Sequence, residues 1–171
     1  QGLYRYETGQ SLETYIEKSY CKTASLIANS ARAAGVLSDA PADQLDLLHR
    51  FGRQLGLAFQ VVDDILDFTG SDAQLGKPAA SDLASGTLTA PVLFAMEEQP
   101  ALAGLIEREF SEEGDLTQAL DLVRQSSGIQ RSRAMAEEMA NEAGDCLAFL
   151  PSSASRDALL DLPEFVLSRL Y

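Results

Sequence analysis

The sequence has no long apolar run and few cysteines. Nowhere in its 171 residues is there a stretch of the ~18 consecutive apolar residues that a membrane-spanning helix needs, so we expect a soluble protein with no membrane span. The two cysteines, Cys21 and Cys146, lie far apart and without metal-ligand spacing, which argues against a disulfide framework. We expect both to be reduced and buried in helices, in a reducing compartment such as the cytoplasm.

Basic residues are also scarce. Thirteen Lys and Arg stand against 26 Asp and Glu, which gives a formal net charge of −13. Nucleic acid is therefore not expected as a partner, because its phosphates would be repelled over most of the surface. An anionic ligand could bind only where metal ions or a local basic cluster reverse the field. The acidic run Glu107–Asp115 is expected to be solvated.

Strand patterning is almost absent, and helical periodicity runs nearly from end to end. A first long helix is predicted from Ser11 or Glu13 to near Gly35, with Tyr15 as a core or interface residue. Asp43 can cap a second long helix that ends near Phe68. A polar loop to Gly86 follows, and the remaining predicted helices begin near Leu88 and then span about 99–110, 115–126, 129–149 and 156–170. We predict an all-α fold of antiparallel helices, formed by residues 1–171 as a single unit.

Three aspartates in the second predicted helix are the sharpest local feature. Asp63 and Asp67 are four residues apart and Asp64 and Asp67 three apart, so the three carboxylates can share one side of the helix. Their neighbours are apolar, and partly buried carboxylates either protonate or recruit cations. Oxygen ligands on a rigid helix suit Mg²⁺, which is usually completed by water and substrate phosphate. The alternative interpretation is the solvated face of an amphipathic helix.

Two of the three lysines are placed where they could flank these carboxylates. Lys22 lies in the middle of the first predicted helix in an apolar context, and Lys77 lies in the loop after the aspartates. An ammonium group is a point charge suited to phosphate oxygens, and a metal ion held by the aspartates could bridge the same group. Taken singly, each lysine has an ordinary structural explanation. Together with the aspartates, they indicate a metal-bridged diphosphate site.

In this order the segments resemble a known family. The matching segments are Lys22-Thr23-Ala24, the run from Gly56 through Phe59-Gln60 to Asp67, and Gly76-Lys77 through Ser81-Asp82-Leu83 to Pro91. Over essentially its whole length the chain is similar to the C-terminal half of the trans-type isoprenyl (polyprenyl) diphosphate synthases. The segments around Lys18 and Leu88 look closest to the long-chain solanesyl-type synthases of cyanobacteria and plastids, so a plant source would imply the plastid stroma.

The resemblance implies the C-terminal portion of an isoprenoid-synthase helical barrel and a role for each matching residue. Asp63 would be the principal Mg²⁺ ligand, supported by Asp64 and Asp67. The diphosphate of the allylic substrate would be held by Lys22 and Lys77. The hydroxyl of Thr23 and the side chain of Gln60 would stabilise the allylic cation, and Phe59 would contact the incoming isopentenyl diphosphate. The implied reaction is a head-to-tail condensation of the two diphosphates, giving a long-chain polyprenyl diphosphate.

The sequence also departs from the family pattern. A first aspartate-rich motif and the upstream basic residues for isopentenyl diphosphate are not found, Gln1 matches the last residue of an upstream segment, and Thr87 replaces a common lysine. We therefore expect a half-site, inactive by itself, whose exposed apolar helix faces associate with a second copy or with the missing N-terminal half. Two alternatives stay open, namely a non-catalytic regulatory subunit of a heteromeric synthase and a terpene cyclase, whose second metal cluster has a different pattern.

Overall fold

The computed structural model describes residues 5–70 and 80–171, and within them every regular element is a helix. The predicted all-α fold is confirmed. Contacts between residues divide the chain into two compact units. Unit 1 comprises Gln1–Tyr15 and Asp63–Ala134, and unit 2 comprises Ile16–Val62 and Met135–Tyr171. Of the predicted loop after the second long helix, Gly76 and Lys77 lie outside the described residues.

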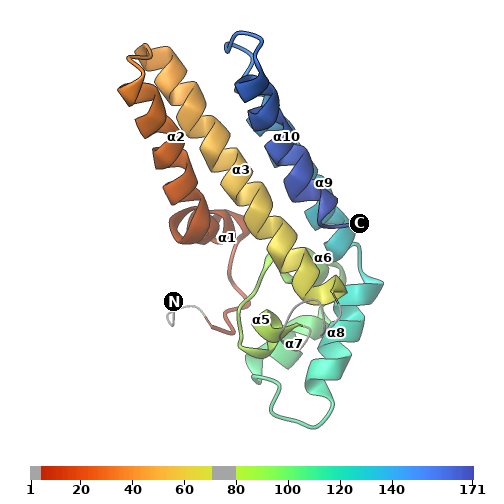
Figure 1. Ribbon diagram of the computed structural model, residues 1–171. Helices are drawn as coiled ribbons and strands as arrows, with labels where there is room; N and C mark the ends of the chain where they lie inside the picture. The colour runs from red at the N-terminus through yellow and green to blue at the C-terminus, as the bar shows by residue number, and fades with distance from the viewer. Residues whose placement is uncertain (1–4, 71–79) are drawn as a thin grey trace. The chain divides into compact units, whose positions relative to one another are not determined.

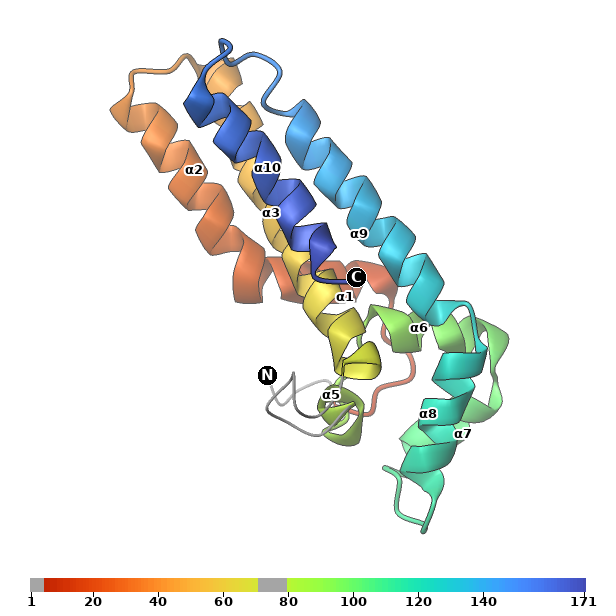
Figure 2. The same ribbon diagram turned by 45° about the vertical axis from the view of Figure 1, so that its right-hand side comes forward.

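Unit 2 is built from long helices packed along their length. It contains α2 (Ser25–Leu37), α10 (Ala154–Ser168) and the parts of α3 (Ala42–Thr69) and α9 (Gly128–Asp145) that belong to it. In both views these helices run alongside one another, and turns link α2 to α3 and α9 to α10 as antiparallel pairs (Figure 1 and Figure 2). This unit's apolar core includes Leu57, Val61 and Leu147, which are fully buried.

Two glycines let α3 approach the preceding helices closely. A Cβ on Gly52 would lie 2.6 Å from the carbonyl oxygen of Ile27 and 2.7 Å from Cα of Ala28. One turn further along α3, a Cβ on Gly56 would lie 2.6 Å from Cα of Ala24. Real Cβ atoms do not approach backbone so closely, so only glycine permits this packing distance.

The end of the first predicted helix differs from the prediction. Gly35 does not end α2, which continues to Leu37, and the chain then turns at Asp39 with φ of 54°. Gly35 is buried instead, and a Cβ there would lie 2.6 Å from Cδ1 of Leu48. The glycine therefore lies in the contact between α2 and α3, which its neighbours in the sequence do not reveal.

Unit 1 packs its short helices around α6 (Ala90–Glu98). All six residues from Ala90 to Ala95 are buried, and Pro91 lies in the first turn as predicted, where its missing N–H is harmless. The helices α7 (Ala101–Glu107) and α8 (Asp115–Gln125) both contact α6. These elements match the predicted helices 99–110 and 115–126 to within a few residues.

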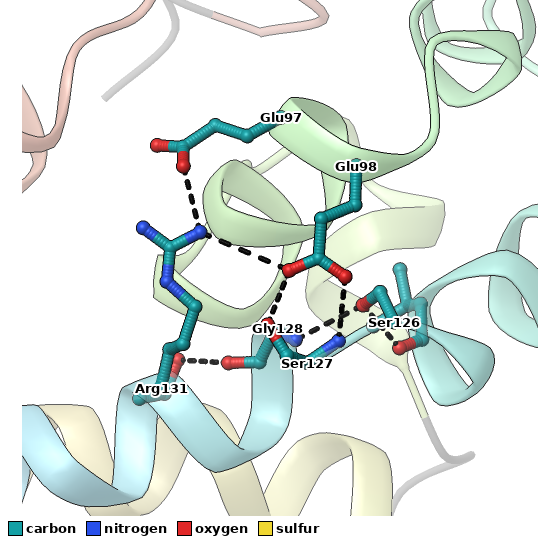
Figure 3. A network of polar contacts seen from close by, with 8 residues as sticks. Glu97, Glu98, Ser126, Ser127, Gly128 and Arg131 are labelled. Atoms are coloured by element: carbon teal, nitrogen blue, oxygen red, sulfur yellow. Dashed lines mark hydrogen bonds and ion pairs between the residues drawn. The ribbon is translucent and has the colours of Figure 1, made fainter.

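A polar network joins the end of α6 to the start of α9 (Figure 3). The backbone N–H of Ser127 donates to Glu98 Oε2 over 3.0 Å, and the Ser127 hydroxyl donates to Oε1 of the same carboxylate. These two bonds hold the pKa of Glu98 below its ordinary value. Arg131 pairs with Glu97 over 2.6 Å and lies over the ring of Phe94 at 4.2 Å. An acidic side chain at a helix start also complements the helix dipole.

The acidic run Glu107–Asp115 was predicted to be solvated, and for Asp115 that prediction is wrong. Asp115 is 3% exposed, and its carboxylate accepts two hydrogen bonds from the guanidinium of Arg108, at 2.7 and 2.5 Å. The backbone N–H of Glu112 also donates to it. The fork geometry of arginine suits such a bidentate pair. Spacing alone did not reveal the turn that brings Arg108 and Asp115 together.

The Arg108–Asp115 pair predicts a specific pH dependence of stability. The hydrogen bonds from Arg108, followed in importance by the backbone bond from Glu112, hold the pKa of Asp115 below its ordinary value. Its stabilising contribution is therefore complete well above the ordinary pKa of an aspartate and is lost as the pH falls through the lowered folded-state value. We expect Asp115→Asn to be less stable than the parent at pH 7, and the gap to narrow as the solution is made acidic. Urea denaturation over a series of falling pH values measures this, and a gap independent of pH would contradict it.

The two cysteines behave differently from each other. Both are free thiols, and burial raises the pKa of the Cys146 thiol, which keeps it unreactive. Cys21 is exposed, so the prediction that both cysteines are buried is wrong for this one. None of the helices in residues 5–70 and 80–171 has the length and hydropathy that crossing a bilayer requires.

Candidate functional site

The predicted site residues belong to two groups, and helix α3 contributes to both. The three aspartates lie in unit 1, whereas Lys22, Thr23, Phe59 and Gln60 lie in unit 2. Lys77 lies outside the described residues. Each group is described within its own unit.

The three aspartates of α3 differ in exposure. Asp64 is 3% exposed and Asp67 is 1% exposed, while Asp63 is only partly buried. The interpretation of this segment as a solvated helix face is therefore wrong for Asp64 and Asp67. Since burying an ionised carboxylate is costly, such groups need hydrogen-bond donors or cations. The surrounding residues of α3, including Ile65 and Phe68, are buried and apolar.

Asp67 is held by the segment that follows the second long helix. Its Oδ1 accepts from the hydroxyl of Ser81 and its Oδ2 from the backbone N–H of Asp82, both over 3.1 Å. Its backbone carbonyl also accepts from the N–H of Ala80, a residue with φ of 55°. The carboxylate thus fixes the start of the short helix α5 (Ser81–Ala84) against α3.

Replacing Asp67 by asparagine should destabilise the chain. The amide keeps the shape of the carboxylate but not its charge. Its oxygen can accept from the N–H of Asp82 and its NH2 group can donate to the Ser81 hydroxyl, so both contacts persist as neutral hydrogen bonds. We expect a loss of about 1–2 kcal/mol in the free energy of unfolding, because hydrogen bonds to a charged group are stronger than neutral ones. Ser81→Ala removes one of the two bonds and should cost about 1 kcal/mol. Urea denaturation measures both variants, and an Asp67→Asn variant as stable as the parent would contradict this role.

The aspartates could bind a divalent metal ion whose remaining ligands are water molecules and phosphate oxygens. In the part of the chain that the structure describes, no cluster of three or more His, Cys, Asp and Glu side chains is arranged to hold a metal ion alone. Oxygen ligands and a partly exposed Asp63 nonetheless fit Mg²⁺, which keeps several waters and is completed by phosphate oxygens. Asp63 would bind the ion, and Asp64 and Asp67 of the same helix would support it.

A π-helix carries two residues of the other group, Lys22 and Thr23. The first predicted helix is α1 (Leu12–Ser19) and α2 joined by the π-helix η1 (Tyr20–Ala24). Lys22 lies exposed on η1, and the Thr23 hydroxyl donates to Oε1 of Gln60 over 2.9 Å. Two residues that the resemblance assigned to one reacting centre are thus in direct contact. The sequence did not predict η1, although such local π-helices often occur at functional sites.

Arg169 contacts the predicted site, although no motif in the sequence points to it. Its guanidinium carbon lies 4.8 Å from the ring centroid of Phe59, a distance typical of a cation–π contact. Gln60, the next residue on α3, is 6% exposed. Arg169 is not part of a motif or a periodic pattern in the sequence. Its contact with Phe59 is visible only in the folded structure.

Comparison with known proteins gives the same family from three directions. The family model described as polyprenyl synthetase matches residues 2–123. A prenyl transferase of Synechocystis sp. is 60% identical over 171 residues, which is all of this chain and 53% of that protein. The chloroplastic solanesyl diphosphate synthase 2 of Arabidopsis thaliana is 47% identical, over 96% of this chain and 40% of its own length.

Solved structures agree with the sequence relatives. The apo form of an Arabidopsis medium/long-chain length prenyl pyrophosphate synthase superposes with a TM-score of 0.85 at 43% identity, over 100% of this chain and 58% of that one. A polyprenyl synthase from Caulobacter crescentus, complexed with calcium and isoprenyl diphosphate, gives a TM-score of 0.86 at 30% identity, over 97% of this chain and 52% of that one.

These relatives are longer than the chain, which spans about half the length of the curated relatives it matches. Within that half, the match includes the aspartates of α3 and the Lys22-Thr23 segment. The chain belongs to the polyprenyl synthetase family.

Proposed function

We propose that the chain is the C-terminal, metal-binding portion of a long-chain polyprenyl diphosphate synthase. The observation that carries the proposal is the state of the aspartates on α3. Asp64 and Asp67 are buried and hydrogen-bonded among apolar residues of α3, beside a more exposed Asp63. A helix with no ligand to bind would gain stability from apolar residues at these positions. The solanesyl and Synechocystis relatives support the assignment to prenyl transfer.

The proposed reaction joins an allylic diphosphate to isopentenyl diphosphate. The carbon–oxygen bond of the allylic diphosphate breaks, its diphosphate leaves, the isopentenyl double bond attacks the allylic carbon, and a proton is lost. Bound Mg²⁺ would offset the negative charge of the departing diphosphate. Lys22 and Lys77 would bind its oxygens, and the oxygen dipoles of Thr23 and Gln60 would face the allylic cation. Phe59 would contact the isopentenyl unit, and apolar helices would exclude water.

The test is a calorimetric titration of a non-ionisable allylic diphosphate analogue into the chain, once with Mg²⁺ and once with EDTA. We expect binding that requires Mg²⁺, because the net charge of −13 repels a diphosphate without a bridging cation. Absence of binding in both buffers would contradict the proposal. It would favour the alternative of a non-catalytic subunit that modulates a partner synthase.

We also propose that the chain associates through α2 with a second copy or with a separate N-terminal half. Leu26 and Leu37 on this helix are 75% and 87% exposed, and exposed leucines on one helix are typical of a surface that a partner covers. Light scattering over a concentration series should show a mass that rises above 18.4 kDa. A constant monomer mass at high concentration would contradict self-association. Co-purification with a separately expressed N-terminal half would then be the remaining test.

A further inference from the structure

Tyr15 makes a buried contact with the aspartate group that the resemblance did not assign. It lies on α1 and is 4% exposed, and its hydroxyl donates to Oδ2 of Asp64 over 2.6 Å. A hydroxyl-to-carboxylate bond of this length is typical of a charge-assisted hydrogen bond. The two residues are 49 positions apart, so the contact exists only in the folded chain.

Packing alone does not explain why residue 15 carries a hydroxyl group. Phenylalanine would fill nearly the same apolar volume, and an apolar residue at position 64 would need no donor. A buried pair of polar groups is rarely more stable than well-packed apolar residues of the same size. The Tyr15–Asp64 pair therefore indicates that a carboxylate is required at position 64 and that its orientation is controlled.

We infer that Tyr15 is a positioning residue of the metal–diphosphate site, acting through Asp64. This inference rests on the proposed function. The hydrogen bond holds Asp64 in one rotamer next to Asp63, as the bonds from Ser81 and Asp82 hold Asp67. Groups that orient metal-binding carboxylates from behind determine metal affinity although they never touch the ion. Tyr15 is thus the donor that prepares Asp64 for a cation or its bound water.

The test compares Mn²⁺ affinity in the parent chain and in Tyr15→Phe. Mn²⁺ replaces Mg²⁺ as a paramagnetic probe. The concentration of free Mn²⁺ is measured by electron paramagnetic resonance in the presence of the non-ionisable allylic diphosphate analogue. We expect Tyr15→Phe to bind Mn²⁺ about 10- to 100-fold more weakly, the usual effect of removing an orienting group. Circular dichroism should show unchanged helix content, because the ring still fills its place.

Two controls separate positioning from stability. Tyr20→Phe removes a hydroxyl that lies 3.4 Å from Nε2 of His49 and belongs to unit 2, whereas the aspartates belong to unit 1, and it should leave the Mn²⁺ affinity unchanged. In an Asp64→Asn background, Tyr15→Phe should weaken binding no further, because its effect passes through Asp64.

The outcomes distinguish the inference from the proposed function. If the parent binds Mn²⁺ and Tyr15→Phe binds it equally well, Tyr15 is only a core residue and the inference is overturned. The same holds if Tyr15→Phe weakens binding as much in the Asp64→Asn background as in the parent. If the parent itself binds no Mn²⁺ with the analogue present, the proposed function fails and the inference fails with it.

Discussion

Gly52→Val should lower the free energy of unfolding by about 3 kcal/mol, the upper end of the usual cost of overpacking a core. The added Cβ would meet Ile27 O, Ala28 Cα and Ala28 N at 2.6 to 2.8 Å. All three are backbone atoms of α2, so no side-chain rotation relieves the overlap and the two helices must separate. For a chain of this length the melting temperature should fall by about 6–12 °C. Differential scanning calorimetry measures it.

The matched control is Gly104→Val on α7. A Cβ on Gly104 would have nothing within 4 Å, and valine has a somewhat better helix propensity than glycine. This variant should stay within about 0.5 kcal/mol of the parent. Equal stability of Gly52→Val and Gly104→Val would mean that α2 and α3 are not in close contact at Gly52.

Asp63→Ala should weaken Mg²⁺-dependent binding of the allylic diphosphate analogue by about 100-fold or more, because loss of a direct ligand exceeds the usual effect of losing an outer group. Asp63 is the least buried of the three aspartates, so a cation reaches it first. Asp43→Ala is the matched control, since it removes the same charge from an exposed position in the first turn of the same helix. Calorimetric titration with Mg²⁺ compares the variants. Equal losses in both would indicate a general charge effect and would contradict a ligand role for Asp63.

The positions of the helices were largely predictable from the sequence. A helix that buries one face repeats its apolar residues with the helical period, and this repeat is visible in the sequence. The predicted second helix ends near Phe68, within one residue of the end of α3, but Asp43 lies inside the first turn of α3 rather than capping it, because the helix already begins at Ala42. The predictions failed where the cause was a distant residue. Gly35 lies inside α2 next to Leu48 and does not end the helix, and Asp115 is buried in its bidentate contact with Arg108.

The candidate site was predictable in its residue types but not in its hydrogen bonds. The spacing of the aspartates and the pairing of Lys22 with Thr23 are local patterns, so they can be recognised in one sequence. The donors that hold the buried carboxylates are not local. Tyr15 lies 49 residues before Asp64, and Ser81 lies 14 residues after Asp67. Neither has a spacing that distinguishes it from an ordinary core or loop residue.

By itself the sequence determined the all-α class, the acidic surface, the family and the helix that carries the aspartates, because periodicity, charge and short motifs are properties of neighbouring residues. The tertiary structure alone decided which aspartates are buried, that a π-helix places Thr23 against Gln60, and that Tyr15 donates to Asp64. Burial and hydrogen bonding depend on which helix faces meet. Which faces meet depends on packing between segments far apart in the chain. At Gly56, for example, the absence of a Cβ atom allows α3 to approach the backbone of Ala24 closely.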